Sequence, residues 1–203
     1  MTDAVTADVH SYRPRTGDAL VLVDIQNDFL PDGALAVPGG NGVIAPLNLS
    51  IREFERHRLP IFATRDWHPT NHCSFRTQGG PWPPHCIAGS QGAEFAALLR
   101  LPPDVHIISK ATHPDTDAYS GFQGTDLVQQ LRSLACTRIF IGGLATDYCV
   151  RATALDALAA GFEAVVLADA VRAVDVQLGD GQRALQEISA RGAQLVATKQ
   201  VLS

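Results

Sequence analysis

Residues 138–167, RIFIGGLATDYCVRATALDALAAGFEAVVL, decide the fold class of this chain. The stretch opens with a short apolar run at 138–141 and closes with another at 164–167, and such runs are typical of strands buried on both faces. Between them, apolar side chains recur at helical spacing over residues 147–160, and Gly161 provides a helix stop. A strand, a helix and a second strand in this order predict a right-handed crossover between parallel strands.

The same alternation continues through the rest of the chain. Further buried strands are predicted at residues 19–23, 60–64 and 105–108, with a weaker sixth at 194–197. The remaining helix candidates lie between the strands, at residues 43–57, 92–100, 126–134 and 180–191. We therefore predict an α/β fold with a doubly wound, six-stranded, mostly parallel sheet covered by helices on both faces, a Rossmann-like three-layer sandwich.

Length and composition fit a single globular domain. The chain has 203 residues, 46% of them hydrophobic and 18% charged, so it can bury a sizeable core and is too apolar to be disordered. We assign the domain to residues 18–203, behind a loose amino-terminal extension at residues 1–17. Residues 69–90 form a long irregular insertion, and such insertions in compact domains usually carry function.

Charge and targeting signals exclude several classes of partner. A formal net charge of -5 without a basic cluster provides no electrostatic footprint for nucleic acid or anionic lipid. Glycines and prolines interrupt the longest uncharged stretch, residues 33–51, so no membrane span is expected. Four cysteines and no export signal favour a cytoplasmic protein with reduced thiols. The expected partners are small molecules or further copies of the same chain.

Reactive side chains follow four of the predicted strands at the same end. They are Asp24 after the first strand, Asp66 and His68 after the second, Lys110 after the third and Cys149 after the fourth. Open parallel sheets bind their ligands beyond the carboxyl ends of the strands. The sequence therefore predicts a catalytic site at this edge of the sheet.

Cys149 is the candidate nucleophile. It lies where a glycine-containing turn enters a helix, and the positive end of a helix dipole favours the thiolate, as Lys110 nearby would too. The alternative is a small buried hydrophobic residue, which is how most cysteines with apolar neighbours behave. That alternative is the one we favour for Cys136, at the entry to a strand.

Asp24 is the candidate base. A cysteine nucleophile needs a group that takes its proton and returns it to the leaving group, and no histidine ends the first or third strand. Burial would raise the pKa of the Asp24 carboxyl, and Lys110 beside it would hold it in place. The alternatives are that Asp24 caps the following turn and that Lys110 is a solvated surface residue.

One carboxylate and three histidines form a candidate metal site. Asp66 and His68 are two residues apart, so in an extended segment they project to the same side, and His72 and His85 follow in the insertion. A carboxylate with two imidazoles and open positions suits Zn²⁺, Fe²⁺ or Mn²⁺. Two alternatives stay open. One is a closed structural zinc site using His72, His85 and the cysteine after each, and the other is a set of histidines that are merely hydrogen-bonded.

Five segments together carry a family resemblance. They are VDIQNDF at 23–29, TRDWHPTNHCSF at 64–75, WPPHC at 82–86, SK at 109–110 followed by DAYSGF at 117–122, and GGLATDYCV at 142–150. In this combination the chain resembles the nicotinamidases, also called pyrazinamidases, of the isochorismatase-like cysteine hydrolases, over residues 18–175. The resemblance implies a six-stranded parallel sheet and hydrolysis of nicotinamide to nicotinate and ammonia, as in NAD salvage. It also implies one bound divalent metal ion, with zinc ahead of iron or manganese.

The resemblance also implies the roles of individual residues. The positions that match the catalytic triad are Asp24, Lys110 and Cys149. Those that match the metal ligands are Asp66, His68 and His85. His72 stands where only some relatives supply a further ligand, so the resemblance leaves it either as a ligand or as a residue behind the ligands.

The substrate-binding positions follow in the same way. Phe29 and Trp82 match the aromatic walls beside the substrate ring, with Tyr119 close by. The peptide before Ala145 matches one that is cis in relatives, and the N–H groups of Ala145 and Cys149 match the oxyanion hole.

Two other functions compete with this hypothesis. A hydrolase of the same superfamily acting on another amide, carbamoyl or vinyl ether substrate would share the triad but generally not the metal ligands. A catalytically silent relative that binds a metal or metabolite would have no need of the intact triad. The resemblance to the nicotinamidases also implies that pyrazinamide is accepted as a substrate.

Overall fold

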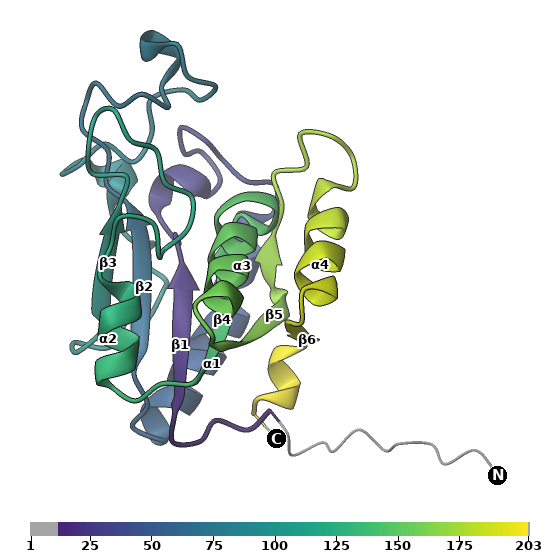
Figure 1. Cartoon of the computed structure of the whole chain (residues 1–203). Coiled ribbons are helices and arrows are strands. Elements are labelled where there is room, and N and C mark those ends of the chain that lie inside the picture. Colours follow the sequence, from purple (N-terminus) through teal and green to yellow (C-terminus); the bar gives the residue numbers. More distant parts are fainter. Residues whose placement is uncertain (1–11, 203) are drawn as a thin grey trace.

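Six parallel strands form one sheet in the computed structural model, which describes residues 12–202 (Figure 1). The strands are β1 Asp18–Val23, β2 Ile61–Asp66, β3 His106–Lys110, β4 Arg138–Leu144, β5 Glu163–Arg172 and β6 Gln194–Val196. Their order across the sheet is β3-β2-β1-β4-β5-β6, and every neighbouring pair is parallel. The predicted doubly wound sheet is confirmed, and it is parallel throughout.

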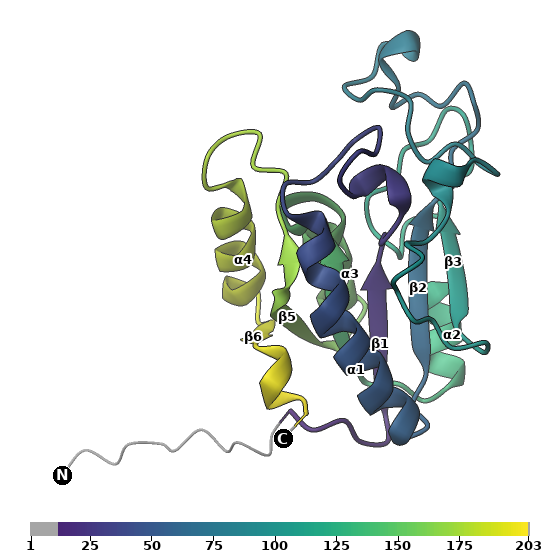
Figure 2. The same ribbon diagram turned by 180° about the vertical axis from the view of Figure 1, so that it is seen from behind.

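In residues 12–202, four α-helices cover the two faces of the sheet. They are α1 Ile44–Arg56, α2 Leu127–Ser133, α3 Arg151–Ala159 and α4 Asp180–Ala190. The two opposite views place α1 on one face and α2, α3 and α4 on the other (Figures 1 and 2). Within the described residues, no helix is both long and apolar enough to cross a membrane.

The central strand β1 is buried on both faces, as its apolar sequence predicts. Leu20 and Leu22 point into the core beneath α1, whereas Val21 and Val23 belong to the core beneath α2 and α3. Alternate side chains of a strand point to opposite faces, so only a strand that is apolar at every position can lie between two such cores. Asp24, the residue that directly follows β1, therefore lies at the middle of the sheet's carboxyl edge.

The helix predicted at residues 92–100 is wrong. This region contains a single 3₁₀ turn, Gln91–Ala93, and then an irregular segment held by backbone hydrogen bonds. Ala96 N donates to Ile25 O at 2.9 Å, and Asn27 N donates to Glu94 O at 3.0 Å. Ala93, Ala96 and Leu99 are buried at every third position, a spacing that resembles a helix face in the sequence.

The other elements lie within a few residues of their predicted bounds. The helix predicted from residue 147 begins as a π-helical turn, Thr146–Val150, and continues as α3. Of the expected loose extension, residues 1–11 lie outside the described residues. Residues 12–17 lie against the domain: the Tyr12 hydroxyl donates to Gln194 at 3.3 Å, and Pro14 is buried. The insertion at 69–90 rises above the carboxyl ends of β2 and β3 (Figure 1).

Candidate active site

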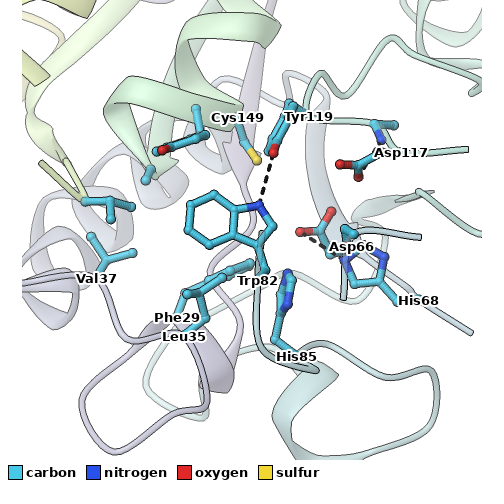
Figure 3. Close-up of a pocket in the computed structure, with 15 residues that line it drawn as sticks. Phe29, Leu35, Val37, Asp66, His68, Trp82, His85, Asp117, Tyr119 and Cys149 are labelled. Atoms are coloured by element: carbon cyan, nitrogen blue, oxygen red, sulfur yellow. Dashed lines mark hydrogen bonds and ion pairs between the residues drawn. The ribbon is translucent and has the colours of Figure 1, made fainter. Parts of the chain in front are cut away.

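A pocket opens at the carboxyl edge of the sheet. Its volume is about 480 Å³, counting the part open to solvent. Side chains from four strand ends and from the insertion point into it, and Figure 3 shows them around one space. The predicted site residues in its lining are Phe29, Asp66, His68, Trp82, His85, Tyr119, Ala145 and Cys149. The structure thus brings together the groups that the sequence places at separate strand ends.

Lys110 lies at the centre of the charged part of the site. Its side chain is fully buried, and Nζ lies 3.0 Å from Asp24 Oδ2 and 3.5 Å from Cys149 Sγ. The ammonium also donates to Asp66 Oδ1 and, at 3.2 Å, to Ala118 O. The alternative of a solvated surface lysine is therefore wrong.

The Asp24 carboxylate faces the neighbouring strands. Thr64 on β2 donates its hydroxyl to Asp24 Oδ1 at 2.6 Å. Oδ2 is at ion-pair distance from Lys110, but within the described residues no donor has hydrogen-bond geometry toward it. One carboxylate oxygen of Asp24 is thus left to accept a proton, which fits a base better than a turn cap.

Burial controls the protonation of the three groups. It raises the pKa of Asp24 above its ordinary value, and the nearby Lys110 charge and the Thr64 hydrogen bond only partly oppose it. Burial also raises the pKa of the Cys149 thiol well above its ordinary value, and Lys110 opposes this shift without reversing it. The Lys110 pKa, which burial alone would lower, is raised by Asp24 and Asp66. Lys110 therefore favours the thiolate as expected but does not suffice, so the resting nucleophile is a thiol that needs a base.

The approach of β4 to β1 depends on Gly143. Its φ is 139°, and a Cβ atom there would lie 2.1 Å from Val23 O. Immediately afterwards the Leu144–Ala145 peptide is cis, as the resemblance implies, and the π-helical turn carries Cys149 into the pocket. Cys136, in contrast, packs in the core beneath α2 and α3, as predicted.

Asp66, His68 and His85 form a second cluster beside the first. One potential ligand atom from each lies within 4.8 Å of the others, and all three residues are buried. His68 Nδ1 donates to Ala111 O at 3.2 Å and His85 Nδ1 donates to Pro83 O at 2.8 Å, since a carbonyl can only accept. Both rings therefore present an Nε2 lone pair, which is the tautomer that metal-ligating histidines use.

His68 Nε2 supports a metal ion at this cluster. It is buried, lies 3.6 Å from Asp66 Oδ2 and has no hydrogen-bond partner within the described residues. A buried nitrogen without a partner is costly unless something binds it, and a carboxylate with two imidazoles is a suitable donor set for a divalent ion. The residues present therefore fit such an ion.

His72 is placed beside the cluster and not in it. Its Nδ1 pairs with Ser74 Oγ at 2.8 Å and its Nε2 donates to Thr116 O at 3.2 Å, so both nitrogens are engaged. Its ring lies against that of His68, with the centroids 4.1 Å apart. Among the described residues, the candidate metal groups include neither Cys73 nor Cys86, which leaves the closed structural zinc site without support.

Aromatic side chains enclose the rest of the pocket. The Trp82 indole N–H donates to the Tyr119 hydroxyl at 3.0 Å (Figure 3). The Trp82 and Tyr148 rings pack edge to face, with their centroids 5.2 Å apart. Phe29 lies beside His85, and the centroids of the two rings are 5.7 Å apart. Tyr148, in the segment GGLATDYCV, also lines the pocket and was not among the residues predicted to bind substrate.

Comparisons with known proteins agree with this arrangement. The family model described as the isochorismatase domain matches residues 18–200. Nicotinamidase from Escherichia coli (strain K12) is 38% identical over 198 residues, which cover 87% of this chain and 93% of that protein. A crystal structure of Pyrococcus horikoshii pyrazinamidase in complex with zinc is 53% identical, with a TM-score of 0.86, and covers 89% of this chain and 99% of its own.

A second solved structure contains a bound ligand. It is a protein from L. infantum in complex with nicotinate, 38% identical, with a TM-score of 0.85, and it covers 92% of this chain and 95% of its own. These matches extend over almost all of the described fold. The chain belongs to the isochorismatase family and, within it, to the nicotinamidases.

Proposed function

We propose that this protein is an amidohydrolase that converts nicotinamide to nicotinate and ammonia, and that also hydrolyses pyrazinamide, through a thioester on Cys149. The observation that carries the proposal is the buried Lys110 ammonium, which contacts Asp24, Asp66 and Cys149 at once. It joins a base and a nucleophile to a metal-binding residue at the floor of an aromatic pocket. A hydrolase of the superfamily without the metal ligands would not have this combination.

In the first half of the reaction, Asp24 removes the thiol proton and the Cys149 thiolate attacks the carboxamide carbon. Burial raises the pKa of the Cys149 thiol well above its ordinary value and raises that of Asp24 as well, so the carboxylate becomes a better proton acceptor for a thiol that needs a base. The tetrahedral oxyanion is stabilised by the N–H groups of Ala145 and Cys149. Lys110 holds Asp24 and stabilises the thiolate.

In the second half, protonated Asp24 gives its proton to the amide nitrogen and ammonia leaves. Asp24, ionised again, activates a water molecule that hydrolyses the thioester and releases nicotinate. The substrate ring lies between Phe29 and Trp82, with Tyr119 holding the indole in place. This apolar enclosure suits a small neutral aromatic amide, which needs a shaped pocket more than a charged one.

The metal ion belongs at Asp66, His68 and His85, and we propose zinc. Zinc is present in the structure of the Pyrococcus horikoshii relative. When bound, the ion supplies a Lewis-acid site for a donor atom of the substrate, such as the pyridine nitrogen. His72 is proposed to support His68 from behind and not to bind the ion, because both of its nitrogens have partners.

Ammonia release from nicotinamide tests the proposal directly. Purified protein loaded with zinc should release ammonia, and Cys149→Ala should abolish the release. Cys136→Ala is the matched control, because it removes a buried thiol that lies in the core and not in the pocket. No ammonia from the unmodified protein, or full activity in Cys149→Ala, would overturn the proposal.

We further propose that residues 18–203 act as one catalytic domain in the cytoplasm. All four cysteines are free thiols, as a reducing compartment requires. A small-molecule substrate is the partner that the pocket supports. Self-association into a homo-oligomer is the other proposed partner, and sedimentation analysis of the purified chain tests it.

A further inference from the structure

Two side chains in the segment 24–29 have no part in the proposed chemistry but contact the segments that carry the metal ligands. The segment starts at Asp24, the proposed base, and ends at Phe29, the pocket wall. Between them lie Gln26, which is fully buried, and Asp28. The buried Gln26 amide and the Asp28 carboxylate both need hydrogen-bond partners. Those partners show which parts of the backbone the two side chains fix in place.

Gln26 uses its whole amide group on backbone atoms. Its Oε1 accepts from Asp66 N at 2.8 Å, and its Nε2 donates to Asp66 O at 2.8 Å and to Ala93 O at 2.9 Å. Both polar backbone groups of Asp66 are thus held by one side chain, as a neighbouring strand would hold them. The Asp66 residue is fixed at the point where its carboxylate must reach both Lys110 and the metal ligands.

Asp28 holds the second metal-binding segment. Its Oδ2 accepts from Cys86 N at 2.7 Å, and its Oδ1 accepts from Ala34 N at 3.2 Å. Cys86 directly follows His85 in the chain. The space around Asp28 is tight, because a Cβ atom at Gly92 would lie 2.2 Å from Asp28 Oδ2.

We propose that Gln26 and Asp28 are positioning residues of the metal site. They fix the backbone of Asp66 and of His85–Cys86 against the same six-residue segment that carries Asp24. The distance between the metal ligands and the base is therefore set by two side chains that touch neither the ion nor the substrate. The inference rests on the proposed metal site, and it adds that this site is built from the β1 side.

The test compares Gln26→Met with Asn27→Ala. Met has nearly the volume of Gln but leaves Asp66 N and O without partners. Asn27 is the matched control, because it lies between the two positioning residues and its Nδ2 donates to Gln91 O at 2.8 Å, away from the metal ligands. The probes are Zn²⁺ affinity, by competition with a chromophoric chelator, and the visible spectrum of the Co²⁺-loaded chain.

Gln26→Met should raise the metal dissociation constant by about 10- to 100-fold, as the loss of groups that orient metal ligands does elsewhere. Its Co²⁺ spectrum should also shift, and Asn27→Ala should match the unmodified protein in both measurements. A Gln26→Met chain that unfolds at lower urea but binds Zn²⁺ with unchanged affinity would overturn the proposal and leave a purely structural role.

If Gln26→Met does not fold, Asp28→Asn tests the same positioning role. Asn retains only one acceptor oxygen for Cys86 N and Ala34 N, so the dissociation constant should still rise, and an unchanged constant would overturn the proposal. The metal measurements use no substrate. Absence of nicotinamide hydrolysis would therefore overturn the proposed function alone, whereas an unmodified chain that binds no Zn²⁺ would overturn this inference.

Discussion

Replacing the buried Lys110 by methionine should destabilise the fold more than any single exposed charge does. The ammonium lies 3.0 Å from Asp24 Oδ2, also contacts Asp66, and is fully buried with Asp24. Removing one partner of a buried ion pair costs about 3–5 kcal/mol, because the remaining charge has no counter-ion. The free energy of unfolding of a folded domain is about 5–15 kcal/mol. Lys110→Met should therefore still fold, but with a much smaller free energy of unfolding.

The loss of unfolding free energy in Lys110→Met should depend on pH. Lys110 keeps the pKa of Asp66 low despite burial, so that stabilisation is present above the ordinary carboxyl pKa and is lost as pH falls below it. Without the ammonium, burial raises the pKa of Asp66 and raises that of Asp24 further, so keeping both groups ionised at neutral pH destabilises the variant. The difference in unfolding free energy between the two proteins should therefore shrink as the pH is lowered from 7 toward the carboxyl range.

Urea unfolding of the chelator-treated chain at several pH values measures both effects. Arg151→Met is the control, since it breaks an ion pair with Glu187 at 2.7 Å whose side chains are about two-fifths exposed. Exposed pairs are screened by water and should lose far less stability. A loss of unfolding free energy in Lys110→Met no greater than that in Arg151→Met, or a loss that is the same at every pH, would refute this prediction.

Three further predictions concern the base, the metal ligands and the metal itself. Thr64→Val removes the hydrogen bond that opposes the raised pKa of Asp24. The acid limb of the plot of kcat/KM against pH should therefore move to higher pH. If the limb does not move, a group other than Asp24 causes it. In chelator competition, His72→Ala should weaken zinc binding by no more than about 10- to 100-fold, and His85→Ala by more, whereas equal losses would make His72 a ligand. Zinc at a hundred times its dissociation constant should raise the free energy of unfolding by about 2.7 kcal/mol, and an unfolding transition that ignores zinc would contradict the metal site.

The sequence was sufficient for the sheet and for the groups at its edge. The inner strands β1, β2 and β4 are short apolar runs buried almost throughout, so their pattern is clear. Parallel strands bring their carboxyl ends to one edge whatever the details of the loops. Asp24, Lys110 and Cys149 could therefore be placed together from their positions after strands. The site geometry agrees with that expectation in each case.

The sequence was not sufficient where a side chain or loop acts through another backbone. Residues 92–100 show an apolar period of three, but their backbone groups pair with the segment 25–27, and no local pattern encodes that pairing. The roles of Thr64 and Gln26 were missed for the same reason, since each contacts a residue 40 positions away. The contact between Lys110 and Asp66, which joins the base to the metal ligands, was likewise visible only in three dimensions.

The strand order also has a consequence for biosynthesis. β1 pairs with β2 on one side and with β4 on the other, and Cys149 is the last of the triad and metal-ligand residues to leave the ribosome. Asp24, Lys110 and the metal ligands are thus all synthesised before β4, the strand that pairs with the second edge of β1. A polypeptide cut between β3 and β4 would divide acceptor from nucleophile, and neither fragment would contain a reactive pair.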